Sequence, residues 1–290
     1  MRGLFAREMS VGDAVAWGAT ALDESDIRCT NSRADAMLIL RHVMHLSAAQ
    51  LQVEWERQLT MAQTQQYNAL LRRRQLGEPL QYILGAQEFF GLRFRVSPAV
   101  LIPRPETEHL VEAAIARLRE TERPHILDVG TGSGAIAVAL AHNLPTAHVT
   151  AVDISAQALE IAAHNAQQNG VADRIRFVES DLLAAVETER FHAIVSNPPY
   201  IATGERKKLP VEVRDHEPEQ ALFAGKSGLE VIQRLVAAAP AALVAGGWLF
   251  MEIGYNQRDA VAALLRGWHT VEFVADLQGI PRVAIGQRPD

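Results

Sequence analysis

The sequence predicts an α/β protein with a mostly parallel seven-stranded sheet, a small N-terminal helical domain and a β-hairpin linker between them. From His125 onward, short apolar runs alternate with helical patterns, as right-handed βαβ crossovers require. Residues 1–76 are rich in helix-forming residues and contain no proline. Residues 77–105 place glycines and prolines between short apolar runs. We therefore expect a helical domain at 1–76, a linker at 77–105 and an α/β domain at 106–290.

The helical region contains signals for at least two helices. Asn31 or Ser32 is placed to cap a helix at its N-terminus. The apolar residues that follow recur at helical spacing and are Ala36, Ile39, Leu40 and Val43. A second helix is predicted from Ala62 to Gln75, and Gly77-Glu78-Pro79 ends the region.

The linker has the pattern of short strands. Its apolar runs at 82–84, 87–90 and 92–96 are separated by Gly85 and Gly91, which predicts strands joined by glycine turns. Prolines at 98, 103 and 105 then stiffen the chain. Helix-forming residues resume at Glu106.

The α/β region supplies seven predicted strands and the helices between them. The strands are predicted at 125–129, 148–153, 175–179, 193–196, 247–253, 271–275 and 283–286. The helices are predicted at 135–142, 156–169, 229–244 and 257–266. Ser155 precedes the second of these helices and Gly170 follows it, at positions where such residues cap helices.

Composition narrows the class of protein. Of the 290 residues, 48% are hydrophobic and 21% charged, as in ordinary soluble globular proteins. The formal net charge of −6 disfavours a primary nucleic-acid binder, which usually has a basic surface. The basic runs at 72–74 and 207–208 are explained by a solvated helix face or loop.

Cysteine usage and hydropathy exclude further classes. Cys29 is the only cysteine, so neither a disulfide framework nor a thiolate metal site can be built, which suits a reducing cytosol. No His/Asp/Glu cluster has metal-ligand spacing. The N-terminus lacks the apolar core of a signal peptide. The most apolar stretch, Leu235–Phe250, is too short and too interrupted to span a membrane.

A glycine loop follows the first predicted strand and opens a helix. Its residues are Asp128-Val129-Gly130-Thr131-Gly132-Ser133-Gly134. Glycines let the backbone turn sharply and let a ligand lie on the main chain, and the helix N-terminus offers free N–H groups. The loop also fits the dinucleotide fingerprint, and Asp153 has the spacing of an acid that accepts from ribose hydroxyls. The pattern predicts a ribose-containing cofactor but leaves its identity open, and a helix-capping role for Asp153 is the alternative.

Asp181 follows the third predicted strand of this region. A carboxylate at that place can accept from an exocyclic amine such as that of adenine. A surface loop aspartate is the alternative interpretation.

Asn197-Pro198-Pro199-Tyr200 follows the fourth predicted strand, at the sheet edge where open α/β proteins bind ligands. The prolines hold the backbone and remove two N–H donors. A substrate –NH₂ could therefore donate to the side-chain oxygen of Asn197 and to the carbonyl of Pro198, while Tyr200 walls in a planar group. Such contacts localise the lone pair of an amide or aniline-like nitrogen and hold it for reaction with an activated methyl.

Together, the glycine loop and residues 197–200 resemble class I S-adenosylmethionine-dependent methyltransferases that act on nitrogen. The segments at 81–85, 90–92 and 101–108 further resemble the linker of the release factor glutamine methyltransferase family (PrmC/HemK). They read Gln-Tyr-Ile-Leu-Gly, Phe-Gly-Leu and Leu-Ile-Pro-Arg-Pro-Glu-Thr-Glu. The resemblance covers almost the whole chain and is most specific from Pro79 to Tyr200.

The resemblance implies methylation of the glutamine in the Gly-Gly-Gln motif of class-1 peptide-chain release factors. It implies S-adenosylmethionine binding by Asp128, Gly130, Thr131, Gly132, Ser133, Gly134, Asp153, Asp181, Leu182 and Asn197. It also implies substrate binding at Asn197, Pro198, Pro199 and Tyr200, with Asn197, Pro198 and Tyr200 catalytic. Leu182 departs from relatives that have Trp there, so aromatic stacking on adenine is lost. We expect a cytoplasmic monomer with a protein substrate, no metal, and no nucleic-acid or membrane partner.

Several other classes of protein share some of these residues. A DNA adenine methyltransferase can have the same tetrapeptide, but it must flip a base and usually has a basic cleft. A glutamine methyltransferase acting on a large-subunit ribosomal protein shares the chemistry, and the Pro-Glu-Thr-Glu at 105–108 favours the release-factor branch. A nicotinamide oxidoreductase or a non-catalytic cofactor-binding subunit would explain the glycines but give residues 197–200 no role. The role of Arg104 also stays open between holding the domains and shaping the pocket.

Overall fold

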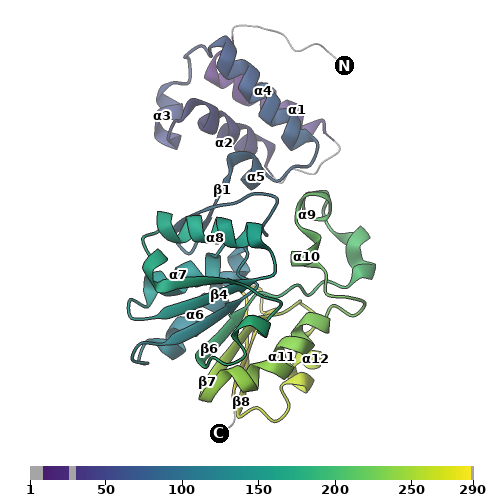
Figure 1. Ribbon diagram of the computed structural model, residues 1–290. Helices are drawn as coiled ribbons and strands as arrows, with labels where there is room; N and C mark the ends of the chain where they lie inside the picture. The colour runs from purple at the N-terminus through teal and green to yellow at the C-terminus, as the bar shows by residue number, and fades with distance from the viewer. Residues whose placement is uncertain (1–8, 26–30, 289–290) are drawn as a thin grey trace. The chain divides into compact units, whose positions relative to one another are not determined.

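The computed structural model describes residues 9–25 and 31–288 and divides into two compact units (Figure 1). One unit comprises Met1–Gly85 and Pro210–His216, and the other comprises Ala86–Leu209 and Glu217–Asp290. The prediction about Cys29 and the first part of the signal-peptide prediction lie outside the described residues. No helix in the described ranges is both long and apolar enough to cross a membrane.

The first unit is helical. Its helices are α1 (Val11–Asp23), α2 (Ser32–Met44), α3 (Ala48–Val53), α4 (Met61–Gln75), α5 (Leu80–Leu84) and α9 (Val211–His216). Asn31 caps α2 as predicted, because its side chain accepts a hydrogen bond from the backbone N–H of Ala34 at 3.0 Å. Tyr67 is fully buried in the core and donates its hydroxyl to the carbonyl of Ala14 at 3.1 Å.

Two expectations for this region are wrong. Residues 82–84, predicted as a strand, lie in α5, which begins after Pro79 and ends at Gly85 in the left-handed conformation (φ +68°). Pro79 and Gly85 are helix-end signals, and a short apolar run alone does not distinguish a strand from a helix. The solvated face predicted for residues 72–74 holds for Arg72 and Arg73 but not for Arg74, which is buried.

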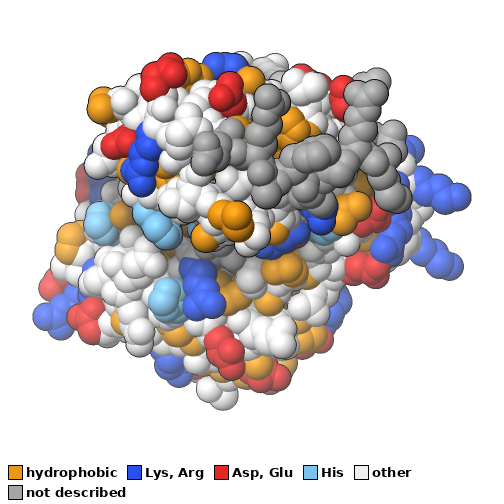
Figure 2. All heavy atoms as spheres, turned by 90° about the horizontal axis from the view of Figure 1, so that it is seen from above, with side chains coloured by type: hydrophobic (Ala, Val, Ile, Leu, Met, Phe, Trp, Pro, Cys, Tyr) orange, Lys and Arg blue, Asp and Glu red, His pale blue; other side chains and the backbone are white. Residues whose placement is uncertain are grey.

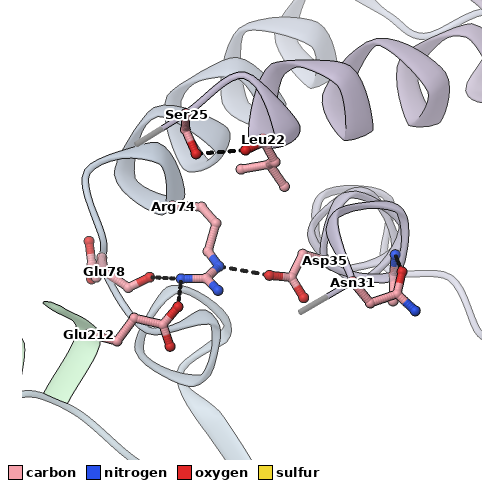
Figure 3. A network of polar contacts seen from close by, with 8 residues as sticks. Leu22, Ser25, Asn31, Asp35, Arg74, Glu78 and Glu212 are labelled. Carbon is pink, nitrogen blue, oxygen red and sulfur yellow. Dashed lines mark hydrogen bonds and ion pairs between the residues drawn. The ribbon is translucent and has the colours of Figure 1, made fainter. Parts of the chain in front are cut away.

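Arg74 is the centre of a polar network inside the helical unit (Figure 3). Its guanidinium donates to the carboxylate of Asp35 at 2.8 Å and to the backbone carbonyl of Glu78 at 3.1 Å. It also pairs with the carboxylate of Glu212 at 2.6 Å. A buried cation is costly unless it is paired and hydrogen-bonded, and these three acceptors meet that need.

The second unit begins with a hairpin. Strands β1 (Ala86–Phe89) and β2 (Leu92–Arg95) pair antiparallel. The two turn residues, Phe90 and Gly91, both have positive φ (52° and 71°), as the two-residue turn favoured in hairpins requires. The predicted hairpin linker is thus confirmed over these residues.

The sheet of the second unit has seven strands, as predicted. They are β3 (His125–Val129), β4 (His148–Asp153), β5 (Ile175–Glu179), β6 (Phe191–Ser196), β7 (Leu243–Glu252), β8 (Thr270–Ala275) and β9 (Pro281–Gln287). Their order is β5-β4-β3-β6-β7-β9-β8, parallel except for the antiparallel pairs of β9 with β7 and β8. The chain order reverses beside β3, so a crevice for ligands is expected at the carboxyl ends of β3, β4 and β6.

Helices cover both faces of this sheet (Figure 1). The helices of the unit are α6 (Glu108–Leu118), α7 (Ala135–Asn143), α8 (Ala156–Gln168), α10 (Glu219–Leu222), α11 (Glu230–Ala242) and α12 (Arg258–Leu264). Single 3₁₀ turns lie at Pro105–Thr107, Ala172–Arg174 and Ala184–Val186, and a longer one at Thr203–Lys208. Apolar residues of α6, α7 and α8 bury one face, and those of α11 and α12 bury the other.

Asn165 of α8 joins the hairpin to the glycine loop. Its fully buried amide accepts from the N–H of Arg95 at 2.7 Å and donates to the carbonyls of Arg95 at 3.0 Å and Ser133 at 2.8 Å. Glu108 of α6 accepts from the N–H of Phe90 at 2.8 Å. These contacts hold the hairpin against the α/β sheet, and the chain that follows it enters the site described next.

Candidate active site

A pocket of about 360 Å³ lies at the carboxyl ends of β3, β4 and β6. That volume is within the ~300–1,000 Å³ range of small-molecule sites. Nine predicted site residues line it, namely Gly130, Thr131, Gly132, Ser133, Asp153, Asp181, Leu182, Asn197 and Pro199. Four do not line it, namely Asp128, Gly134, Pro198 and Tyr200. The structure therefore brings four separate segments of the sequence, at the ends of β3, β4, β5 and β6, to one cavity.

The glycines of the loop have different structural roles. Gly130 and Gly132 have φ of 73° and 55°, and a side chain at either would meet no atom within 4 Å. Their lack of a Cβ therefore serves the backbone turn and leaves the pocket wall bare. Gly134 (φ +80°) packs on α8, where an added Cβ would lie 3.0 Å from the Cβ of Ala162.

Asp153 stands at the tip of β4 and binds the glycine loop. One carboxylate oxygen accepts from the N–H of Gly132 at 2.8 Å, and the other accepts from the N–H of Ser155 at 2.9 Å. Burial raises the pKa of Asp153, and the backbone N–H groups of Ser155 and Gly132 oppose that shift. Ser155 itself caps α8, so capping does not account for Asp153. Each oxygen retains a lone pair for a ligand hydroxyl.

Asp128 supports the loop from beneath. Its fully buried side chain accepts from the hydroxyl of Thr131 at 2.6 Å and from the N–H of Ala137 at 3.2 Å, both at Oδ2. The other oxygen, Oδ1, has no hydrogen-bond partner among the described residues. Burial raises the pKa of Asp128 to about 7, since desolvation penalises the charged carboxylate.

Asp181 and Leu182 border the pocket after β5. The carboxylate of Asp181 is half-exposed and pairs at 2.7 Å with Arg234 of α11, which also lines the pocket. Only Oδ2 of Asp181 makes this contact. Leu182 adopts a left-handed backbone (φ +52°) that is uncommon for a leucine, and its partly buried side chain packs against the core beneath α11.

Residues 197–200 follow β6. Asn197 lines the pocket and donates from Nδ2 to the hydroxyl of Thr107 at 3.1 Å. Pro198 is buried, and no hydrogen bond between described residues uses its carbonyl oxygen. The Tyr200 hydroxyl donates to the buried carboxylate of Glu252 on β7 at 3.1 Å, and burial raises the pKa of that phenol. The carbonyl of Tyr200 accepts from the side chain of Gln257 at 2.9 Å.

The proline-rich segment after the hairpin forms part of the same pocket. Leu101, Pro103 and Thr107 line it. Arg104 pairs at 2.5 Å with Glu217, whose side chain is 1% exposed. Glu217 directly precedes the pocket residue Pro218 in the chain. Arg104 thus holds a pocket wall within the α/β unit.

Two family models match the chain. The model of the PrmC N-terminal domain matches residues 13–85, and that of the methyltransferase small domain matches residues 107–213. The release factor glutamine methyltransferase of Koribacter versatilis (strain Ellin345) is 47% identical over 258 residues, which cover 89% of this chain and 91% of that protein. The enzymes of the same description from Chlorobaculum tepidum and Burkholderia pseudomallei are 46% and 43% identical, over 80% and 88% of this chain and 82% and 92% of theirs.

The chain belongs to the release factor glutamine methyltransferase family.

Solved structures share the fold of this family member. The hMettl16 catalytic domain superposes with a TM-score of 0.57 at 20% identity, over 76% of this chain and 82% of that one. The T. thermophilus 16S rRNA N2 G1207 methyltransferase superposes with a TM-score of 0.53 at 22% identity, over 70% of this chain and 49% of that one. Both likenesses concern the fold alone, and they show that the seven-stranded sheet is arranged as in those two proteins.

Sequence reasoning missed several pocket residues of this family member. Ile154, Phe223 and Arg234 line the pocket, and Glu252 lies behind it. Ile154 directly follows Asp153 and is 59% exposed. An apolar residue beside a carboxylate predicted to bind ribose could have indicated a side chain that packs on the adenine ring. The other three come from segments with no local motif, so only the fold brings them to the site.

The polar and apolar groups that line the pocket are those that a nucleoside cofactor requires. It combines a bare glycine backbone, the acceptor Asp153, a half-exposed acceptor at Asp181 and apolar walls at Ile154 and Leu182. Among the described residues, no group of three His, Cys, Asp or Glu side chains could hold a metal ion. On the face seen in Figure 2, basic and acidic side chains are interspersed.

Proposed function

We propose that this protein transfers a methyl group from S-adenosylmethionine to the side-chain nitrogen of the glutamine in the Gly-Gly-Gln motif of class-1 peptide-chain release factors. Its membership of the family supports this assignment. The observation that supports it most directly is the position of Asn197 and the free acceptor oxygen of its side chain. This residue lines the cavity that the glycine loop also lines, and its Oδ1 accepts no hydrogen bond from a described residue.

The residues that would hold the cofactor follow from the pocket. Asp153 would accept from the ribose hydroxyls, and the exposed oxygen of Asp181 would accept from the adenine amine. Leu182 and Ile154 would cover the adenine ring. Asp128 would act through the loop, because its carboxylate holds Thr131 and does not line the pocket.

Bound S-adenosylmethionine supplies an electrophilic methyl, so that an N–C bond forms while an S–C bond breaks. The chain must orient a weakly nucleophilic amide nitrogen for that reaction. Oδ1 of Asn197 and the carbonyl of Pro198 would each accept one N–H of the substrate amide. Both acceptors stabilise positive charge as it develops on nitrogen, and one proton then leaves. Tyr200 does not line this pocket, and Glu252 holds its hydroxyl, so the role of its ring as a wall for the amide rests on the family resemblance.

We further propose that the helical unit grips the release factor and that the protein acts as a monomer in the cytoplasm. Relatives are described as acting on release factors, which supports a protein partner for a domain that the PrmC N-terminal model matches. Light scattering of the purified protein, alone and with a release factor, tests the stoichiometry.

The deciding experiment offers four substrates separately with methyl-labelled cofactor. These are a class-1 release factor, the same factor with Ala in place of the motif glutamine, a large-subunit ribosomal protein and duplex DNA. We expect label only on the unmodified release factor. Label on DNA alone would contradict the proposal. Label on the ribosomal protein alone would show instead a glutamine methyltransferase that acts on a large-subunit ribosomal protein.

The role of Asn197 is tested in the same assay. Asn197→Ala should lower kcat by about 10²-fold, because an oriented polar group is lost at the reacting centre. Cofactor affinity should stay within about threefold, a change of well under 1 kcal/mol. Asn143→Ala, on the exposed end of α7, is the matched control. Unchanged turnover in Asn197→Ala would remove Asn197 from the mechanism.

A further inference from the structure

A chain of side-chain hydrogen bonds runs behind residues 197–200. Nδ2 of Asn197 donates to the Thr107 hydroxyl at 3.1 Å, and that hydroxyl donates to Oε2 of Glu252 at 2.5 Å. The Tyr200 hydroxyl donates to the other oxygen, Oε1, at 3.1 Å. Both ends of the tetrapeptide therefore connect to one carboxylate.

The four groups come from three separate parts of the chain. Thr107 lies in the Pro-Glu-Thr-Glu segment that resembles the family linker, and Glu252 ends β7. Thr107 is 3% exposed and Glu252 is 2% exposed. Water therefore has little access to these bonds, and their direction is set by the protein groups alone.

When Glu252 is ionised, its charge determines the direction of every bond in the chain. An ionised carboxylate can only accept, so the Thr107 hydroxyl must donate to it. The only proton of that hydroxyl is then used, and its oxygen can only accept from Asn197. Asn197 must consequently turn its NH₂ group toward Thr107 and leave Oδ1 toward the pocket. If Glu252 were protonated, it could donate to Thr107 and allow the opposite order.

We infer that Glu252 and Thr107 are positioning residues, which hold the Asn197 amide with its oxygen toward the substrate nitrogen. The inference rests on the proposed function, because it assigns how Asn197 is made an acceptor for a substrate –NH₂. A reversed Asn197 would present NH₂ to the substrate amide, and two donors would face each other. Neither Glu252 nor Thr107 is assigned contact with the transferred methyl.

The burial of Glu252 supports a role beyond packing. A buried carboxylate is weak as a stabilising device, since desolvation offsets its attractions. Its partners at hydrogen-bond distance are the hydroxyls of Thr107 and Tyr200, and no described cation forms an ion pair with it. Arg282 acts from a longer range and pairs with Asp276 at 2.9 Å. The two neutral hydroxyls do not compensate fully for the desolvation of the Glu252 carboxylate. The arrangement therefore orients the hydroxyls of Thr107 and Tyr200 more than it stabilises the fold.

The same network predicts a pH dependence. Burial raises the pKa of Glu252, and the nearby charge of Glu106 raises this pKa further. The hydroxyls of Thr107 and Tyr200 and the charge of Arg282 lower the same pKa. Protonation of Glu252 on the acid side removes the fixed direction of the bonds. Turnover should therefore fall as the pH drops through the raised pKa of this carboxyl.

The test compares shape-conserving variants of the full-length protein. Thr107→Val removes the hydroxyl, Thr107→Ser keeps it, and Glu252→Gln removes the charge. Thr150→Val is the matched control, because Thr150 is a 1% exposed threonine of β4 outside the network. For each we would measure kcat, KM for the release factor, the pH profile of kcat and the Kd of a Gly-Gly-Gln peptide with S-adenosylhomocysteine present. Thermal unfolding reports whether each variant folds.

We expect Thr107→Val and Glu252→Gln to lower kcat by about 10- to 100-fold, as loss of groups that orient metal ligands does. Peptide binding should weaken in both, Thr107→Ser should retain most activity, and Glu252→Gln should flatten the acid side of the pH profile. Folded variants with the kcat, peptide affinity and pH profile of Thr150→Val would overturn the inference. If Thr107→Val does not fold, Glu252→Gln and Thr107→Ser decide it. A wild-type protein that labels no release factor instead removes the proposed function, a separate outcome.

Discussion

The guanidinium of Arg74 and the carboxylate of Glu212 lie 2.6 Å apart, although Arg74 belongs to α4 near the start of the chain and Glu212 to α9. Residues 210–216 follow the tetrapeptide at 197–200 in sequence, yet they belong to the helical unit. The helical unit is therefore not a continuous stretch of sequence. Arg74 holds this inserted segment together with α2 through Asp35.

Arg74→Met should destabilise the helical unit. The side chain is 6% exposed, and its loss leaves Asp35 and Glu212 without their cation. Breaking a buried ion pair costs ~3–5 kcal/mol, and partial exposure of both carboxylates reduces this to about 2 kcal/mol. Urea unfolding monitored by circular dichroism measures the change. Arg72→Met, on the exposed face of α4, is the control, and equal midpoints for the two variants would contradict the prediction.

Asp153→Ala should weaken cofactor binding before it affects anything else. The carboxylate lines the pocket beside Gly132 and is the acceptor proposed for two ribose hydroxyls. Hydrogen bonds to a charged group contribute ~1.5–3 kcal/mol, so Kd should rise about 10- to 100-fold. Titration calorimetry with S-adenosylhomocysteine measures it, with exposed Asp173→Ala as the control. A Kd that matches the control would leave Asp153 as a structural support of the loop.

Asp128 should make stability depend on pH. Its pKa rises from 3.8 to about 7 on folding, so between these values the folded protein binds the proton more tightly than the unfolded chain. The contribution is present below about pH 4 and is lost as pH rises through 7, by up to about 4 kcal/mol. Asp128→Asn removes that dependence and should gain stability relative to the wild type between pH 5 and pH 8. Urea unfolding at both pH values checks it, and a constant difference would rule it out.

Gly134→Ala should cost more stability than Gly130→Ala. Both glycines have positive φ, at 80° and 73°, so both substitutions incur about 1–2 kcal/mol of backbone strain. Only the Cβ at 134 meets α8, at 3.0 Å from the Cβ of Ala162, which adds about 1–3 kcal/mol of overpacking. Thermal and urea unfolding of the two variants provides the comparison. Equal losses would show that α7 and α8 separate easily.

Local patterns predicted the elements of the α/β unit well, because buried strands and amphipathic helices have distinct periods. The predicted strand at 175–179 coincides with β5, and the predicted helix at 156–169 with α8 to within one residue. The prediction failed at 82–84, where the run was too short to show a period. It also failed at Arg74, because adjacent residues of a helix point in different directions and a run of like charges does not report burial.

Local patterns in the chain predicted the seven strands, the glycine loop and the tetrapeptide at 197–200. They also predicted that these loops meet, because parallel strands bring their carboxyl-end loops to one edge of the sheet. The order of the strands comes from the structure. The contacts that support the glycine loop and the tetrapeptide come from long-range packing. The clamp of Asn165 on the hairpin, the bond from Thr107 to Glu252 and the pairing of Arg74 with Glu212 join residues far apart in the chain. Such contacts depend on how packed elements meet, and they leave no periodic trace in the sequence. The orientation of the Asn197 amide also depends on such long-range contacts.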